Sequence, residues 1–199
     1  MPRAAPGAEG LIGPNAVLQL LPVIERLGGQ DRVRGMLDRA RIAEVPDGSQ
    51  MIPEGQAARL HGLLRVEEPD RAASLAAEAG RRTADYILRH RIPAFAQRIL
   101  RLLPAPLAAR LFSKAIARHA WTFAGSGGFT VVTPWTFEIA DNPVIRGEVS
   151  AAPLCHWHAA VFERLYRVLV HPKSRCVEVA CGAQSGAGVC RFEISVPRA

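Results

Sequence analysis

The last third of the chain, from Pro153 to Val196, constrains the fold more than any other segment, because it contains all four cysteines of the sequence. Cys155 stands where a helical pattern begins, and Cys181 and Cys190 flank a glycine-containing turn between two strand-like segments. Thiolates from a helix start and a hairpin can meet around a metal ion, and structural zinc takes such ligands in a tetrahedral array. The pattern therefore favours a fold in which this helix and this hairpin touch.

A carboxylate completes the predicted ligand set, which comprises Cys155, Glu178, Cys181 and Cys190. With every tetrahedral position filled by the protein, the zinc would be structural and not catalytic. Residues three apart on a regular strand point to opposite faces of the sheet. Glu178 and Cys181 can therefore share a metal only if the strand bends near Ala180–Cys181, which the flexible Gly182 would allow.

Spacing alone leaves other arrangements open. Cys176 could replace Glu178, and His156 or His158 could serve as a ligand. Three thiolates and a carboxylate around a divalent ion carry net negative charge, which nearby cations could offset, namely Lys173, Arg175 and Arg191. The cysteines could equally be small buried apolar side chains without a metal.

The composition is that of one folded unit. A chain of 199 residues with 49% hydrophobic residues can form one domain, or one domain with an extension. It lacks the run of about 18 to 20 apolar residues that a membrane-spanning helix needs. Residues 1–10, which we expect to be disordered, lack the apolar segment of a secretory signal. We therefore expect a cytoplasmic protein, whose cysteines are reduced or metal-bound.

The formal net charge of +7 is concentrated in one region, because no acidic residue occurs between Asp85 and Glu138. The basic residues there are Arg89, Arg91, Arg98, Arg101, Arg110, Lys114 and Arg118. Such a block suits an anionic partner, which could be a carboxylate-bearing ligand, a membrane surface or nucleic acid, or it is simply a solvated face. Nucleic acid is disfavoured because the basic residues belong to no recognised binding motif.

Helix signals fill the chain up to about residue 123. Asparagine, aspartate and proline stand at the expected helix starts, and apolar residues recur at helical spacing after each of them. We expect helices from Asn15 to the Gly28–Gly29 pair, over 32–42, after Pro53, from Pro69 to His90 with a weak point at Gly80, from Pro93 to Leu103, and from Pro106 to about Phe123.

The remaining part alternates strands with one helix. Aromatic and β-branched residues predict strands over 129–133, 135–139, 175–180 and 189–196, and a helix over 153–170. This order predicts an α+β fold, a small antiparallel sheet of about four strands packed with helices. We expect a helical N-terminal extension over residues 11–79 and a ligand-binding domain with the zinc site over residues 80–199.

Three runs in this part resemble a known family: FEIADNPVIRG, PLCHWHAAVFERLY and CVEVACGAQSGAGVCRFEISV. They are similar to the vinyl reductase (4-vinyl reductase) domain, whose motif is a helix-start Cys, Glu-x-x-Cys, a glycine-containing turn and Cys-x-Phe-x-Ile. The motif falls on the four predicted ligands and on Phe192 and Ile194. The same domain occurs in phenol-responsive transcription activators, where these positions bind zinc, and the resemblance implies zinc here.

The resemblance covers about residues 80–196. One departure is the segment HWHAAVFERLY after Cys155, where the family often has a glycine. The family fold is an antiparallel sheet packed with helices that commonly dimerises. The whole chain is most similar to the stand-alone family members of bacteriochlorophyll biosynthesis in purple phototrophs.

The family name implies a reductase that acts on a vinyl group of a divinyl chlorophyll precursor. Hydride transfer from a nicotinamide or flavin normally needs a glycine-rich turn between a strand and a helix. The glycine-rich segments 125–128 and 182–188 do not fit, since the first follows a helix and the second lies in a hairpin. We therefore favour a carrier or assisting protein that binds a tetrapyrrole of the divinyl protochlorophyllide type.

Two alternatives stay open beside the carrier. One is the vinyl reductase itself, and the other is a small-aromatic sensor that acts through a partner. A carrier would hand its pigment precursor to other pigment-biosynthesis enzymes, and its basic helices could press on the inner membrane surface.

The predicted ligand pocket lies on the last basic helix and the strand after it. The residues that offer planar or apolar contact are Phe112, Ile116, Trp121, Phe123 and Trp135. His119 could coordinate a central magnesium, and Arg118 could pair with a propionate. In the phenol sensors a histidine and a tryptophan of this region contact the ligand, and His119 and Trp135 are the nearest matches. The competing interpretation is ordinary core packing.

Overall fold

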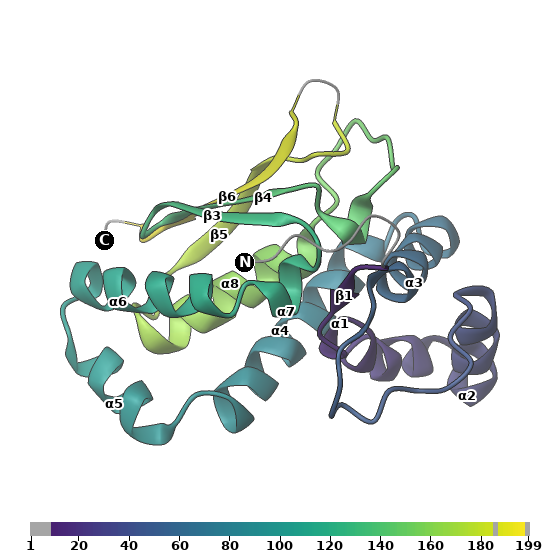
Figure 1. Cartoon of the computed structure of the whole chain (residues 1–199), viewed down its shortest axis with the longest axis horizontal. Helices are drawn as coiled ribbons and strands as arrows, with labels where there is room; N and C mark the ends of the chain where they lie inside the picture. The colour runs from purple at the N-terminus through teal and green to yellow at the C-terminus, as the bar shows by residue number, and fades with distance from the viewer. Residues whose placement is uncertain (1–8, 185–186, 198–199) are drawn as a thin grey trace.

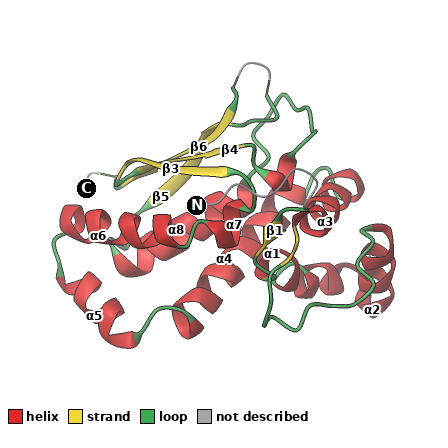
Figure 2. Ribbon diagram, in the orientation of Figure 1, coloured by secondary structure: helices red, strands yellow, loops and turns green. Residues whose placement is uncertain are grey.

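The computed structural model describes residues 9–184 and 187–197, and its architecture is α+β, as predicted. One antiparallel sheet lies over a layer of helices, and a second group of helices from the N-terminal part lies beside that layer (Figures 1 and 2). None of the helices in this described part is long and apolar enough to cross a membrane.

The main sheet has the order β3-β4-β6-β5, with every neighbouring pair antiparallel. Its strands are β3 (Gly128–Thr133), β4 (Thr136–Ala140), β5 (Arg175–Ala180) and β6 (Val189–Ser195). Along β6, Phe192 and Ile194 are buried while Glu193 and Ser195 are exposed, because successive strand residues face opposite sides. The predicted four-stranded sheet with one buried face is confirmed.

The helices follow the proline and glycine signals closely. Their bounds are α1 (Asn15–Leu18), α2 (Leu21–Arg39), α3 (Glu54–Glu67), α4 (Ala72–His90), α5 (Ala94–Leu102), α6 (Ala105–Arg118), α7 (Trp121–Ala124), the 3₁₀ turn η1 (Pro143–Ile145) and α8 (His156–Leu169). Within α2 the backbone leaves the helix at Gly28 and Gly29, where the φ of Gly29 is 66°, so the predicted stop appears as a kink.

One helix is shorter than predicted. The pattern that starts near Pro106 was expected to run to about Phe123, but α6 ends at Arg118 and the short helix α7 follows separately. His119 closes α6 with a φ of −113°, outside the helical range. The apolar spacing continues across this break, which is why the periodicity alone did not reveal it.

The N-terminal part and the sheet share one core. Residues 1–8 of the segment expected to be disordered lie outside the described residues, whereas the Gly10 carbonyl accepts a hydrogen bond from the Glu54 N–H at 2.8 Å. β1 (Leu11–Ile12) pairs with β2 (Ile52–Pro53), a contact that the sequence did not predict. The buried Glu54 carboxylate accepts bonds from the Ser126 hydroxyl at 2.7 Å and from Arg146 at 2.6 Å.

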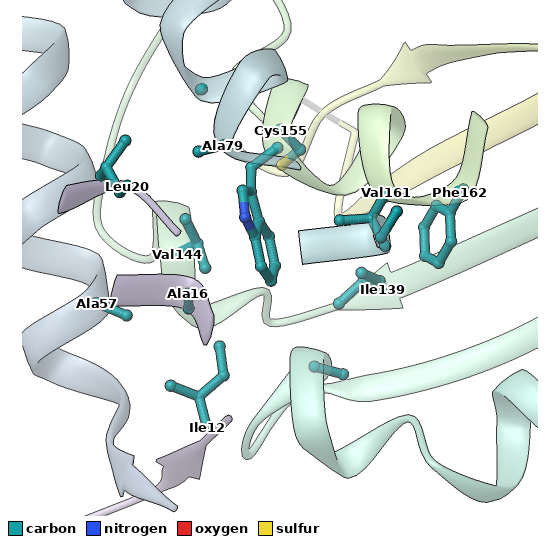
Figure 3. Packing of buried hydrophobic residues seen from close by; sticks show 14 of the residues in the cluster. Ile12, Ala16, Leu20, Ala57, Ala79, Ile139, Val144, Cys155, Val161 and Phe162 are labelled. Atoms are coloured by element: carbon teal, nitrogen blue, oxygen red, sulfur yellow. The ribbon is translucent and has the colours of Figure 1, made fainter. Parts of the chain in front are cut away.

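The expected boundary between residues 79 and 80 falls inside the continuous helix α4. Buried side chains from both sides of it, such as Ala16, Ala57, Val144 and Val161, pack in one cluster (Figure 3). The extension therefore forms part of the same folded unit as the sheet.

Helix α4 packs closely against α8, and Gly80 makes this approach possible. A Cβ atom at residue 80 would lie 2.3 Å from the Trp157 carbonyl oxygen and 2.9 Å from the Ala160 Cβ atom. Gly80 was predicted to be a weak point of its helix. In the fold it is instead the place where two backbones meet.

The substitution Gly80→Ala should lower the free energy of unfolding by about 1 to 3 kcal/mol, because α4 and α8 must move apart to accept the methyl group. Urea denaturation followed by circular dichroism measures this. Gly35→Ala in α2 is the matched control. A Cβ atom at residue 35 meets no atom within 4 Å, so this change should leave stability equal or raise it by up to about 1 kcal/mol. Equal stability of the two variants would contradict the close packing.

Candidate metal centre and ligand cavity

The structure brings together the four side chains that the sequence analysis selected as metal ligands. One ligand atom from each of Cys155, Glu178, Cys181 and Cys190 lies within 4.8 Å of the others, and all four residues are buried. Cys155 caps the N-terminus of α8, Glu178 lies on β5, Cys181 follows β5, and Cys190 lies on β6. The site thus joins a helix start to two neighbouring strands.

A bulge in β5 allows Glu178 and Cys181 to face the same side. Glu178 pairs with Phe192 and Ala180 pairs with Arg191, so β5 has one residue more than β6 over this stretch. The extra residue lets two positions three apart point into one cluster. A bend was required by the sequence argument, and it occurs at Val179, slightly before the expected place. Gly182 contributes in another way, because its N–H donates to the Cys190 sulfur at 3.4 Å.

Polar groups around the cluster are directed at its sulfur atoms. Asn142 Nδ2 donates to Cys155 Sγ at 3.2 Å and to Cys190 Sγ at 3.6 Å, and these two sulfurs are 3.3 Å apart. The sequence pattern indicated only a turn at Asn142. Its side-chain oxygen also accepts from the Val144 N–H, so the turn holds the amide in place.

The carboxylate of Glu178 is only half satisfied by the protein. Its Oε2 accepts a hydrogen bond from the Cys155 N–H at 2.7 Å, while its Oε1 is buried without a hydrogen-bond partner among the described residues. An unpaired buried carboxylate oxygen is costly, since nothing replaces the water that it has lost. A metal ion among the thiols would satisfy this oxygen, and the donor set of three sulfurs and one oxygen suits zinc.

The pKa values of the cluster show the same unmet charge. Hydrogen bonds from the Cys155 and Cys190 thiols hold the pKa of Cys181 far below its usual range. The same hydrogen bond to Cys181 raises the pKa of Cys155. Burial raises the pKa of Glu178 to about 8. Without a cation, the site can therefore hold one thiolate and resists further negative charge.

The alternative ligands lie outside this cluster. Cys176, His156 and His158 do not belong to the metal-competent group. His158 Nε2 instead donates to the Phe123 carbonyl at 3.2 Å. Of the cations proposed to balance the charge, Arg191 pairs with Glu138 at 2.7 Å and Arg175 lies 3.8 Å from Glu163. Neutral N–H donors, led by Asn142, take the place that we expected these cations to fill.

A separate cavity of about 600 Å³ lies between helices α4, α5, α6 and α8 and is closed at one side by the N-terminal segments 13–16 and 48–51. Five of the predicted ligand-binding residues line it, namely Phe112, Ile116, His119, Trp121 and Phe123. Its further lining is largely apolar and comes from Ile87, Ile92, Leu100, Val161, Phe162 and Leu165, among others.

Two predicted pocket residues do not line this cavity. Arg118 is exposed, because it lies two positions from Ile116 and so faces another side of α6. Trp135 lies in the turn between β3 and β4, where its ring packs 5.6 Å from that of Tyr166. The cation that does line the cavity is Arg91, just after α4.

His119 is oriented by its own helix. Its Nδ1 lies 2.9 Å from the Ala115 carbonyl oxygen, and a bond to a carbonyl requires the nitrogen to carry the proton. Neutral His119 in this tautomer has its lone pair on Nε2. That nitrogen can accept a hydrogen bond or ligate a metal ion of a bound molecule.

Trp157 is the largest wall residue that the sequence analysis missed. Its indole Nε1 donates to the Thr83 hydroxyl at 3.2 Å, and the Thr83 hydroxyl donates to the Ala79 carbonyl at 2.9 Å. The available signal was the helical spacing of Trp157, Val161 and Leu165. This spacing is equally typical of ordinary helix packing, so it did not single out Trp157 as a wall residue.

The metal centre and the cavity are two ends of one helix. Cys155 caps α8 within the cluster, and Trp157 and Val161, within the first two turns, line the cavity. Fixing the start of α8 therefore fixes the cavity wall.

Comparison with known proteins places the chain in a family. The model of the 4-vinyl reductase domain matches residues 135–196. The bacteriochlorophyll synthase 23 kDa chain of Cereibacter sphaeroides is 52% identical over 191 residues, which cover 95% of this chain and 92% of that one. The protein of the same name from Rhodobacter capsulatus is 46% identical, with 96% and 92% covered. The chain belongs to this family of 4-vinyl reductase domain proteins. The resemblance seen in the cysteine motif is thereby confirmed.

Solved structures support the fold. An H-NOX protein variant from K. algicida in the Fe(II) unliganded state has a TM-score of 0.56 at 12% identity, with 94% of this chain and 97% of that chain covered. A Cs H-NOX variant has a TM-score of 0.55, the same identity and the same coverage. At this identity the likeness concerns the arrangement of helices and sheet alone.

A buried histidine behind the cavity wall makes stability depend on pH. His61 Nε2 donates to the Ala16 carbonyl at 3.0 Å, and its ring meets the Trp157 ring edge-on at 5.9 Å. Burial lowers the pKa of His61 to about 3. Between this value and the unfolded pKa of about 6.5, the unfolded chain binds a proton that the folded chain does not. The stability contribution of neutral His61 is therefore fully present above about pH 6.5 and is lost as the pH falls.

We expect the stability difference between pH 7 and pH 5 to be smaller by about 2 kcal/mol in His61→Gln than in the natural chain, because the variant has lost this titration. Urea denaturation at the two pH values measures it. His90→Gln, which changes an exposed histidine, is the control and should follow the natural chain. An unchanged difference in His61→Gln would show that His61 is protonated in the folded protein.

Proposed function

We propose that the protein binds a tetrapyrrole precursor of bacteriochlorophyll in the α4–α5–α6–α8 cavity and serves as a carrier or assisting factor for reduction of its vinyl group. Membership in the family of the bacteriochlorophyll synthase 23 kDa chains supports the pathway. The cavity supports the binding role.

The observation that carries the proposal is the cavity itself. Its volume of about 600 Å³ is within the range of small-molecule and cofactor sites, about 300 to 1,000 Å³. Aromatic rings from three helices, Phe112, Phe123 and Trp157, contribute to the lining. Flat, apolar surfaces of this kind suit a planar macrocycle, since stacking and area burial both favour it.

Two polar residues give such a ligand an orientation. His119 has the free Nε2 lone pair that a central magnesium ion would accept, and Arg91 offers a guanidinium for a propionate carboxylate. Arg91 takes the role that we had assigned to Arg118. Both side chains border the apolar space, as expected for groups that orient a largely apolar molecule.

We also propose that the cysteine cluster binds one structural zinc ion through Cys155, Glu178, Cys181 and Cys190. The unpartnered Glu178 Oε1 and the crowded thiols support this assignment. Zinc would neutralise the buried negative charge and hold the start of α8 against the β5–β6 hairpin. With four protein ligands it would leave no position for a substrate.

The pigment proposal predicts that divinyl protochlorophyllide binds with micromolar affinity and changes its absorbance spectrum. His119→Ala should weaken this binding by about tenfold or more, because the axial magnesium contact is lost. Absorbance titration of the purified protein measures it. The control variant is His90→Ala, since His90 is exposed and is not part of the cavity lining.

The magnesium-free form of the pigment sharpens this test. It should bind the natural protein and His119→Ala equally, because it offers no metal to His119. No spectral change with either pigment at micromolar protein would refute the proposal. Vinyl reduction on addition of NADPH to the purified protein alone would instead favour the reductase.

For the metal centre, we expect about one zinc ion per chain in purified protein by metal analysis. Cys181→Ser should abolish zinc binding. Cys176→Ser should retain it, because Cys176 lies outside the cluster and its N–H bonds to Glu163. Full metal content in Cys181→Ser, or a metal-free natural protein that folds normally after zinc supplementation, would contradict the assignment.

A further inference from the structure

Helix α5 exposes large apolar side chains to solvent. Phe95, Ile99 and Leu102 are 68%, 52% and 86% exposed, and their spacing places them on one face of the helix. Leu107 and Leu111 of the following helix α6 are 44% and 46% exposed. Single exposed apolar residues are ordinary, but five on two consecutive short helices form a candidate interaction surface. We name these five residues the α5–α6 patch.

Cations surround the patch. The exposed residues Arg98, Arg110, Lys114 and Arg118 lie on the same two helices, and the sequence has no acidic residue between Asp85 and Glu138. Within residues 9–184 and 187–197, none of these four cations forms a salt bridge. The patch therefore combines apolar and positively charged groups without compensating carboxylates.

The opposite side of α5 faces the cavity. Ala96 and Leu100 of α5, together with Ile92 just before it, line the cavity, whereas the exposed face carries the patch. In Figure 1 the helix lies at the outer edge of the molecule, away from the sheet. Prolines 93 and 104 flank α5 and separate it from α4 and α6. α5 is thus a wall with the cavity on one side and the patch on the other.

We propose that the α5–α6 patch docks on the surface of an anionic lipid bilayer and places the cavity wall against the membrane. Apolar side chains on an amphipathic helix enter the interfacial region, and neighbouring arginine and lysine residues bind anionic headgroups. A second copy of the chain fits less well, because two patches of the same positive charge would repel each other. Nucleic acid would leave Phe95 and Leu102 uncovered.

The docking surface requires no ligand. The function we give it, passage of a pigment precursor between the bilayer and the cavity, rests on the proposed function. A tetrapyrrole has large apolar surface and partitions into membranes, so a carrier that opens beside the bilayer avoids exposing it to water.

Flotation of the full chain with lipid vesicles tests the docking. The protein should bind vesicles of equal parts phosphatidylglycerol and phosphatidylcholine, and bind those of phosphatidylcholine alone far more weakly. Binding should decrease as salt is raised. Arg98→Gln/Arg110→Gln/Lys114→Gln should weaken it by about fivefold for each cation removed.

The apolar contribution has a matched control. The triple variant Phe95→Ser/Ile99→Ser/Leu102→Ser should lose about tenfold or more in vesicle binding. The variant Val66→Ser/Val149→Ser/Val177→Ser replaces three valines that are 78%, 89% and 57% exposed elsewhere, and it should bind as the natural chain does. Circular dichroism verifies that both variants are folded.

Equal vesicle binding by the two triple variants, or no binding by the natural chain, would overturn the proposal. So would light scattering that shows a natural dimer dissociating in the Phe95 variant without any lipid binding, since the patch would then be a dimer interface. Pigment titration without lipid separates the two proposals. The exposed Phe95, Ile99 and Leu102 do not line the cavity, so their loss should leave pigment affinity unchanged.

Discussion

The structure depends on the contact between the start of α8 and the β5–β6 hairpin. Cys155, at the N-terminal cap of α8, meets Cys190 with 3.3 Å between the two sulfurs, and its N–H binds the Glu178 carboxylate. This contact joins the helical layer to the sheet at its most polar buried point. A buried group of thiols and a carboxylate is stable only when its charge is compensated, so the fold and the metal proposal depend on the same few atoms.

The cavity follows from how α8 is held at its two neighbours. Gly80 lets α4 approach the backbone of α8 near Trp157, and the sheet covers another side through Phe162 and Tyr166. α5 and α6 then span the remaining side without filling it. Space of this kind is costly to leave empty in a protein of this size. A ligand that fills it would contribute to stability as well as to function.

The two proposals join into one physical account. A planar apolar ligand is held between aromatic side chains, with His119 and Arg91 at its polar groups. The outer face of α5 carries exposed Phe95 and Leu102 next to cations that no carboxylate among the described residues compensates. A single thin helix thus separates the ligand space from the surface that suits a membrane. The zinc site takes no part in this chemistry and keeps α8 in position.

The sequence by itself determined the local features. Residue alternation identified the strands, proline and glycine marked most helix ends, and the Glu-x-x-Cys spacing with Cys155 and Cys190 identified the cluster, because these signals act over a few residues. Only the tertiary structure decided which side chains border the cavity. Arg91 replaces Arg118, Trp157 enters and Trp135 leaves, since helix packing and not spacing determines which face turns inward. Asn142 and the N-terminal segments likewise gain their roles through contacts between residues far apart in the chain, which no local pattern records.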